Sequence, residues 1–175
     1  MQFNISFQNQ KVNSHLDIFR NFPKLIRLIF KNANKNTHTI AEELKILEYY
    51  LELESLRFSP KFSYHFDIDP KLTIDTIEIP SMLIQPFVEN ALVHGLLHKA
   101  AGYVEIRLIK NEKFLICSIT DNGIGREAAI IQKQKGLVHE SMAVRLSTER
   151  VDMLARLSNH KVSIEINDIK MHKVR

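Results

Sequence analysis

Apolar residues in the first third of the chain recur every three or four positions, the spacing of amphipathic helices. Residues 12–29 follow this spacing, which predicts one helix that Pro23 kinks or restarts. Residues 39–42, Thr-Ile-Ala-Glu, fit a capping box, and the apolar positions after them predict a second helix as far as Phe58. The polar residues 31–38 then form the loop of a helical hairpin.

From Phe62 the apolar period changes to two, which is the period of a β-strand. The alternation predicts strands at residues 62–68, 77–79, 103–109, 114–120 and 162–166, with helices near 79–96 and 141–157. Residues 110–112 connect the third and fourth of these strands as a hairpin turn. This order favours an α+β fold, a two-layer α/β sandwich with helices on one face of a mixed sheet.

Two stretches in the second half carry the candidate chemistry. The predicted helix at 79–96, IPSMLIQPFVENALVHGL, is apolar almost all round, with Asn90 and His94 on one polar stripe and Glu89 beside it. Buried amides and carboxylates are costly unless hydrogen-bonded, so this stripe needs a partner. Residues 119–125, ITDNGIG, end a strand with a carboxylate and two glycines. Together they predict a nucleotide pocket.

Composition narrows the class of protein. The chain has 175 residues, 45% of them hydrophobic and 25% charged, which is typical of one globular domain. No apolar run reaches the roughly 18–20 residues that span a bilayer, so we expect no membrane contact by this chain itself. The formal charge is +4, but the basic residues are scattered, so we expect no nucleic acid partner. No secretory signal is visible and Cys117 is the single cysteine, which favours the cytoplasm.

Five segments, taken in order, resemble the cytoplasmic part of LytS-type sensor histidine kinases, whose ATP-binding domain has the GHKL (Bergerat) fold. These segments are FPKLIRLIF, EELKILEYYLELESLRF, IPSMLIQPFVENALVHGL, ITDNGIG and RLSTERVDML, and the resemblance covers residues 19–168. It implies a helical dimerisation and connector segment at residues 1–58, followed by a GHKL catalytic domain at 59–175.

The resemblance also implies roles for individual residues. The Asn90 amide oxygen is expected to coordinate Mg²⁺, a hard cation that takes oxygen ligands. Glu89 is expected to orient the attacking group or its water, and His94 to lie near the phosphates. A polar helix edge that simply faces solvent is the alternative for this trio.

A second set of residues corresponds to the family's glycine boxes. Asp121 is expected to accept a hydrogen bond from the adenine amino group, while Gly123 and Gly125 let the backbone approach the base. An ordinary Asp-Asn-Gly turn is the alternative. Ala143 stands where the second box normally has glycine, which puts the lid contact in doubt. Arg150 fits the family's arginine-leucine pattern loosely, and a packing role stays open for it.

By resemblance, the chain transfers the γ-phosphate of ATP to a histidine, and the phosphoryl group passes on to a response regulator. A homodimer through the N-terminal helices is expected, and a full-length parent would place this chain at the cytoplasmic face of the inner membrane. The family's Pro-His acceptor pair is missing, and FNISF at 3–7 fits the tail of that motif, so we expect a fragment. The family's final strand is also expected to be missing. The alternatives are a non-catalytic ATP-binding regulator (a degenerate kinase) and an ATPase that hydrolyses to water.

Overall fold

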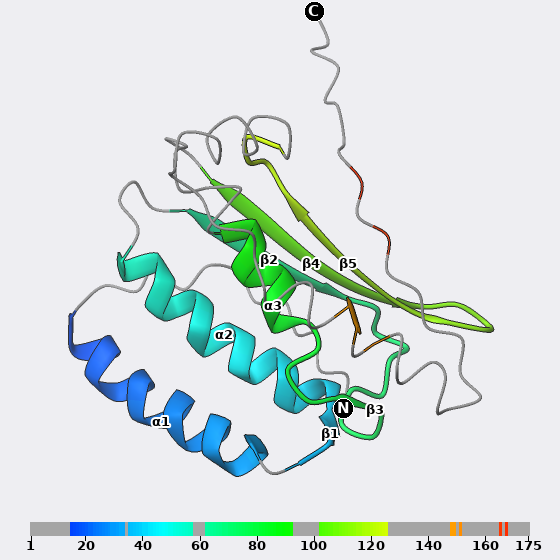
Figure 1. Ribbon diagram of the computed structural model, residues 1–175, viewed down its shortest axis with the longest axis horizontal. Coiled ribbons are helices and arrows are strands. Elements are labelled where there is room, and N and C mark those ends of the chain that lie inside the picture. Colours follow the sequence, from blue (N-terminus) through cyan, green and yellow to red (C-terminus); the bar gives the residue numbers. More distant parts are fainter. Residues whose placement is uncertain are drawn as a thin grey trace, which may run out of the picture.

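The computed structural model describes residues 15–33, 35–57, 62–92 and 102–125, together with residues 148, 149, 151, 165 and 167. Three helices and five strands are assigned in this part of the chain (Figure 1). They are α1 (His15–Ala33), β1 (Thr37–Thr39), α2 (Ile40–Arg57), β2 (Ser63–Ile68), β3 (Glu78–Pro80), α3 (Gln85–Asn90), β4 (Tyr103–Lys110) and β5 (Leu115–Asp121).

The strands form a three-stranded sheet in the order β2-β4-β5 and a small two-stranded sheet of β1 and β3. Strands β2 and β4 run parallel, whereas β4 and β5 are antiparallel, so the larger sheet is mixed, as predicted. Helices α2 and α3 lie on one face of it, and α1 packs against α2 (Figure 1). The arrangement is α+β and agrees with the predicted layering of helices on a mixed sheet.

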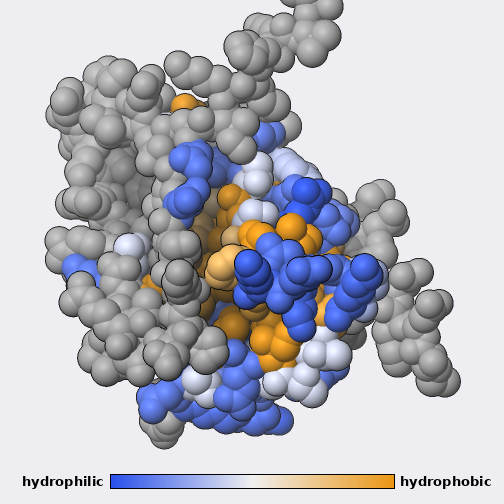
Figure 2. Space-filling view, turned by 90° about the vertical axis from the view of Figure 1, so that its right-hand side faces the viewer, coloured by the Kyte–Doolittle hydropathy of each residue, from blue (hydrophilic) through white to orange (hydrophobic). Residues whose placement is uncertain are grey.

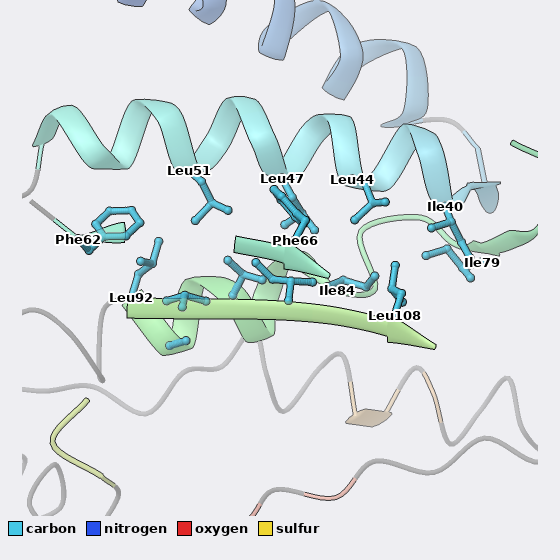
Figure 3. Packing of buried hydrophobic residues seen from close by; sticks show 14 of the residues in the cluster. Ile40, Leu44, Leu47, Leu51, Phe62, Phe66, Ile79, Ile84, Leu92 and Leu108 are labelled. Carbon is cyan, nitrogen blue, oxygen red and sulfur yellow. The ribbon is translucent and has the colours of Figure 1, made fainter. Parts of the chain in front are cut away.

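The core lies between α2, α3 and the strands (Figure 3). Leu47 and Leu51 point from α2 toward the sheet, and both are fully buried. The strands meet them with the side chains that alternation predicted, including Phe66 on β2 and Ile106 on β4. Burying one such side chain stabilises the fold by about 1.5–3 kcal/mol relative to leaving it exposed. Helix α2 is therefore held on the sheet mainly by this apolar contact.

The start of α2 confirms the predicted capping box. The Glu42 backbone N–H donates to Thr39 Oγ1 (3.2 Å), and the Thr39 N–H donates to the Glu42 carboxylate (3.3 Å). The loop predicted for residues 31–38 is wrong in part, because α1 continues to Ala33 and β1 begins at Thr37. Helix α1 also passes through Pro23 without restarting.

The helix predicted from residue 79 begins later than expected. Pro80 belongs to β3, where it pairs with Thr37, and α3 begins only at Gln85, with Pro86 in its first turn. Between them Met82 has a φ of 57°, a left-handed conformation that ends any continuous helix. The predicted part of this helix beyond residue 92 and the elements predicted after residue 125 lie outside the described residues.

The far end of the β4–β5 hairpin carries exposed apolar side chains. Figure 2 views the molecule from this side and shows apolar surface interspersed with charged groups. The large apolar side chains exposed on the hairpin are Ile109, Phe114, Leu115 and Ile116. Within the described parts of the chain, no helix combines the length and the apolar character needed to cross a bilayer.

Candidate functional site

Helix α3 carries two of the predicted site residues in its last turn. Glu89 and Asn90 are half-buried, whereas Val88 on the same helix and Leu92 just after it are fully buried in the core. The Gln85 side chain reaches along the helix, and its Nε2 donates to Glu89 Oε1 at 2.8 Å. The polar edge of a buried helix that the sequence predicted is therefore present.

Asp121, the last residue of β5, lies on the helix-covered face of the sheet. It pairs directly with Val104 of β4, and directly paired residues of antiparallel strands project to the same face. Val104 is fully buried in the cluster beneath the helices, so the Asp121 side chain also projects to that side. Asp121 itself is exposed. Helix α3, which ends at Asn90, packs into the same cluster through Val88, so Asn90 and Asp121 belong to elements that meet on one face of the sheet.

The glycine turn after β5 is anchored to β4. The Asn122 side-chain oxygen accepts from the Tyr103 N–H (2.8 Å), and the Asn122 N–H donates to the Tyr103 carbonyl (3.2 Å). Asp121 Oδ1 accepts from the Gly123 N–H at 2.8 Å, which is the local turn bond of an Asx-turn. Gly125 has a φ of +78°, a backbone conformation that favours glycine. A Cβ at this position would meet open space, so the backbone conformation and not crowding is the reason for glycine.

Partial desolvation and the nearby Glu105 carboxylate raise the pKa of Tyr103, which begins β4 beside this turn. Its phenol is therefore neutral at physiological pH and adds no charge to this end of the sheet. Of the predicted site residues, His94, Ala143 and Arg150 lie outside the described residues, and their roles stay predictions.

Sequence reasoning missed a buried polar cluster at the start of α3. Glu43 of α2 is 0% exposed, and its carboxylate accepts from the backbone N–H groups of Met82 (3.1 Å), Ile84 (2.9 Å) and Gln85 (3.2 Å). His38 of β1, which is also buried, contacts it through Nε2. The sequence did hold a sign of this cluster, because Glu43 falls on the apolar stripe of α2, and a carboxylate buried there is costly unless it has hydrogen-bond partners.

Comparisons with known proteins match this arrangement to one class. A family model described as histidine kinase matches residues 4–62, which include α1, β1 and α2. The sensor protein LytS of Oceanobacillus iheyensis is 32% identical over 109 residues, which is 62% of this chain and 18% of that protein. The LytS of Staphylococcus saprophyticus is 29% identical over 147 residues, which is 82% of this chain and 24% of that protein. These matches relate the chain to the LytS-type sensor histidine kinases.

Another relative, the uncharacterized protein YwpD of Bacillus subtilis, is 32% identical over 126 residues, 69% of this chain and 44% of that protein. The chain therefore spans less than half the length of each of these relatives. The match to the Staphylococcus saprophyticus LytS leaves only 18% of this chain outside it, so it includes α2, α3 and strands β2 to β5. The region aligned with this LytS therefore includes the positions of Glu89, Asn90 and Asp121.

Proposed function

We propose that this chain is the ATP-binding catalytic portion of a two-component sensor histidine kinase. In this function the chain binds ATP, the γ-phosphate is transferred to a histidine, and a response regulator receives it. The family relationship supports the class of activity. The observation that carries the assignment of the site is that Asp121 and the polar end of α3 border the same face of the sheet.

Asp121 is proposed to bind the adenine amino group. Its carboxylate projects from the end of β5 and is exposed, so a base is able to approach it. Asp121 Oδ1 already accepts a hydrogen bond from the Gly123 N–H, and this bond fixes the orientation of the carboxylate. The second carboxylate oxygen, Oδ2, is thereby oriented as well. Gly125, with its positive φ, turns the chain without a side chain at the position where the base would lie.

Asn90 and Glu89 are proposed to act at the phosphate end of the nucleotide. Their amide and carboxylate oxygens suit Mg²⁺, which usually shares one or two protein oxygens with substrate phosphates. Among the described residues no three His, Cys, Asp or Glu side chains gather into a metal cage, which fits a cation brought in with ATP. Mg²⁺, when bound, neutralises charge on the phosphates. Glu89, whose carboxylate accepts a hydrogen bond from Gln85, is proposed to orient the attacking group.

Helix α1 is proposed to form the homodimer interface. Phe22 and Phe30 on this helix are 52% and 74% exposed, which is high for aromatic side chains. Burial of such side chains against a second copy would supply the free energy of association. Light scattering on the purified chain tests this proposal: a dimer that Phe30→Ser converts to monomer supports it, and a wild-type monomer at all concentrations contradicts it.

The experiment that tests the activity uses the chain with Mg-ATP labelled at the γ-phosphate and an acceptor-bearing segment of a LytS relative. Acid-labile label on the acceptor is the expected result, and Asn90→Asp and Asp121→Asn are expected to reduce it strongly. ATP binding without transfer would contradict the kinase proposal and support the degenerate, regulatory alternative. Steady release of inorganic phosphate without any labelled histidine would instead support an ATPase.

A further inference from the structure

The start of α3 is held by a residue from outside the helix. Its N-cap residue, Ile84, has a side chain that cannot accept a hydrogen bond, yet the first N–H groups of a helix need acceptors. Glu43 Oε1 accepts from both Ile84 and Gln85, and Pro86 has no N–H. The Phe87 and Val88 N–H groups donate back to the Ile84 carbonyl. Glu43 of α2 therefore completes the cap of α3.

The same carboxylate also holds the turn before the helix. Glu43 Oε2 accepts a hydrogen bond from the Met82 N–H. Met82 has a φ of 57°, which is unfavourable for any residue other than glycine. The Ser81 N–H donates to the Asn36 carbonyl at 3.1 Å, which ties this turn to the segment before α2. The entry into α3 is thus fixed to Glu43 near the N-terminal end of α2, and to the segment before it, by several backbone hydrogen bonds.

His38 orients the Glu43 carboxylate. Both Glu43 oxygens accept backbone N–H groups, and His38 Nε2 lies 2.5 Å from Glu43 Oε2, which is hydrogen-bonding distance. Among the described residues His38 Nδ1 has no hydrogen-bond partner, so the ring is held there through its Nε2 contact with Glu43. The side chains of both residues are 0% exposed, so water does not compete for these bonds.

Gln85 extends the connection to the candidate site. Its backbone N–H is bound by Glu43, and its side-chain Nε2 donates to Glu89 Oε1. Among the described residues Gln85 Oε1 has no partner, so the side chain is held there by the bond that its Nε2 donates to Glu89. His38, Glu43, Gln85 and Glu89 therefore form one hydrogen-bonded series from the helical N-terminal part to the polar edge of α3.

Building on the proposed function, we propose that Glu43, oriented by His38, is a positioning residue for phosphoryl transfer. It sets the position of α3 and, through Gln85, the orientation of the Glu89 carboxylate. A shift of α2 relative to the sheet then moves Glu89 with it. Because misplacement of a reacting group by about 1 Å costs up to a hundredfold in rate, such a link controls transfer without changing which groups bind ATP.

The experiment compares the full chain with Gln85→Met and Glu43→Gln, and Glu48→Gln is the matched control. Glu48 is a carboxylate on the same helix, paired only with the exposed Lys45 among the described contacts. Gln85→Met cuts the link to Glu89 and leaves the backbone cap. We expect it to lower the rate of labelled phosphoryl transfer about tenfold or more while the KM for Mg-ATP stays within about threefold.

Glu43→Gln removes the charge and one acceptor, so hydrogen exchange of the amides at 84–88 is expected to be at least about tenfold faster, as for the loss of one charged hydrogen bond. Because part of the effect of Glu43 on Glu89 passes through Gln85, the losses in transfer rate of the two variants are expected to be less than multiplicative in the double variant. Glu48→Gln is expected to match the wild type in every measurement.

The outcomes separate the two proposals. If the wild type binds ATP and transfers phosphate but Gln85→Met does so at the same rate, the positioning role is wrong and the function stands. If the wild type transfers nothing, the proposed function and the inference built on it both fail. Unchanged exchange at residues 84–88 in Glu43→Gln would overturn the positioning role even with an active wild type.

Discussion

Replacing Leu47 by alanine is the sharpest test of how α2 belongs to the fold. Leu47 is 0% exposed and points from α2 into the cluster beneath the sheet (Figure 3). Leu→Ala at such sites costs about 2.7–5 kcal/mol, because transfer free energy and packing are both lost. Against a typical total of about 5–15 kcal/mol, this is a large fraction of the free energy of unfolding. Urea unfolding followed by circular dichroism should therefore show a much lower midpoint with an unchanged slope.

The matched control is Leu53→Ala on the same helix, where the leucine is only half-buried. Its expected loss is about 1 kcal/mol, in proportion to the apolar area that it removes. If Leu47→Ala destabilised the chain no more than Leu53→Ala, α2 would not be part of the sheet's core. That result would refute the reasoning and would instead favour a helical N-terminal segment that separates from the sheet near residue 58.

Three further predictions follow from local features. Thr39→Ala should lower the free energy of unfolding by about 1 kcal/mol because it removes the capping bond, whereas Thr39→Ser should retain it; equal midpoints for the two would contradict the cap. Burial raises the pKa of Glu42, but hydrogen bonds from the Thr39 backbone, Lys31 and Lys35 outweigh it, so the net pKa is lowered from 4.5. The stability that Glu42 contributes is present above pH 4.5 and is lost as the pH falls through the lowered pKa. Glu42→Gln should therefore make the free energy of unfolding fall less steeply at acid pH. An unchanged acid dependence in this variant would contradict the role of Glu42. Met82→Gly should leave stability unchanged or raise it by about 1 kcal/mol, because glycine adopts a φ of 57° without strain, while Met82→Ile should lower it; the melting temperatures decide.

The sequence predicted those parts of the fold that depend on neighbouring residues. The capping box at Thr39 and the alternation of β4 are local patterns that the structure confirms; β5 forms near the predicted place, but its side chains are mostly exposed and do not alternate in burial. The start of α3 was missed because it depends on Glu43, which lies about forty residues earlier in the chain. Strand β1 was missed for the same reason, since its partner β3 lies far away in sequence.

The candidate site shows the same division. Glu89, Asn90 and Asp121 were identified from motifs, and the register of β4 and β5 then gave the face on which Asp121 lies. The burial of His38 and Glu43 was not predicted, because two consecutive glutamates in the first turn of a helix are typical of solvent-exposed residues that interact with the helix dipole. Only the position of Glu43 on an apolar stripe distinguished it from Glu42, its half-buried neighbour in sequence.

The central claim is that one adenine nucleotide binds between the polar end of α3 and Asp121. Calorimetric titration of the purified chain with Mg-ATP and with Mg-GTP, for the wild type and Asp121→Asn, tests it most directly. We expect the wild type to bind ATP and to prefer it over GTP. Asp121→Asn should weaken ATP binding at least about tenfold, as for the loss of a hydrogen bond to a charged group, and should erase the preference. A wild type that binds no ATP, or an Asp121→Asn variant that binds it as tightly as the wild type, would contradict the account.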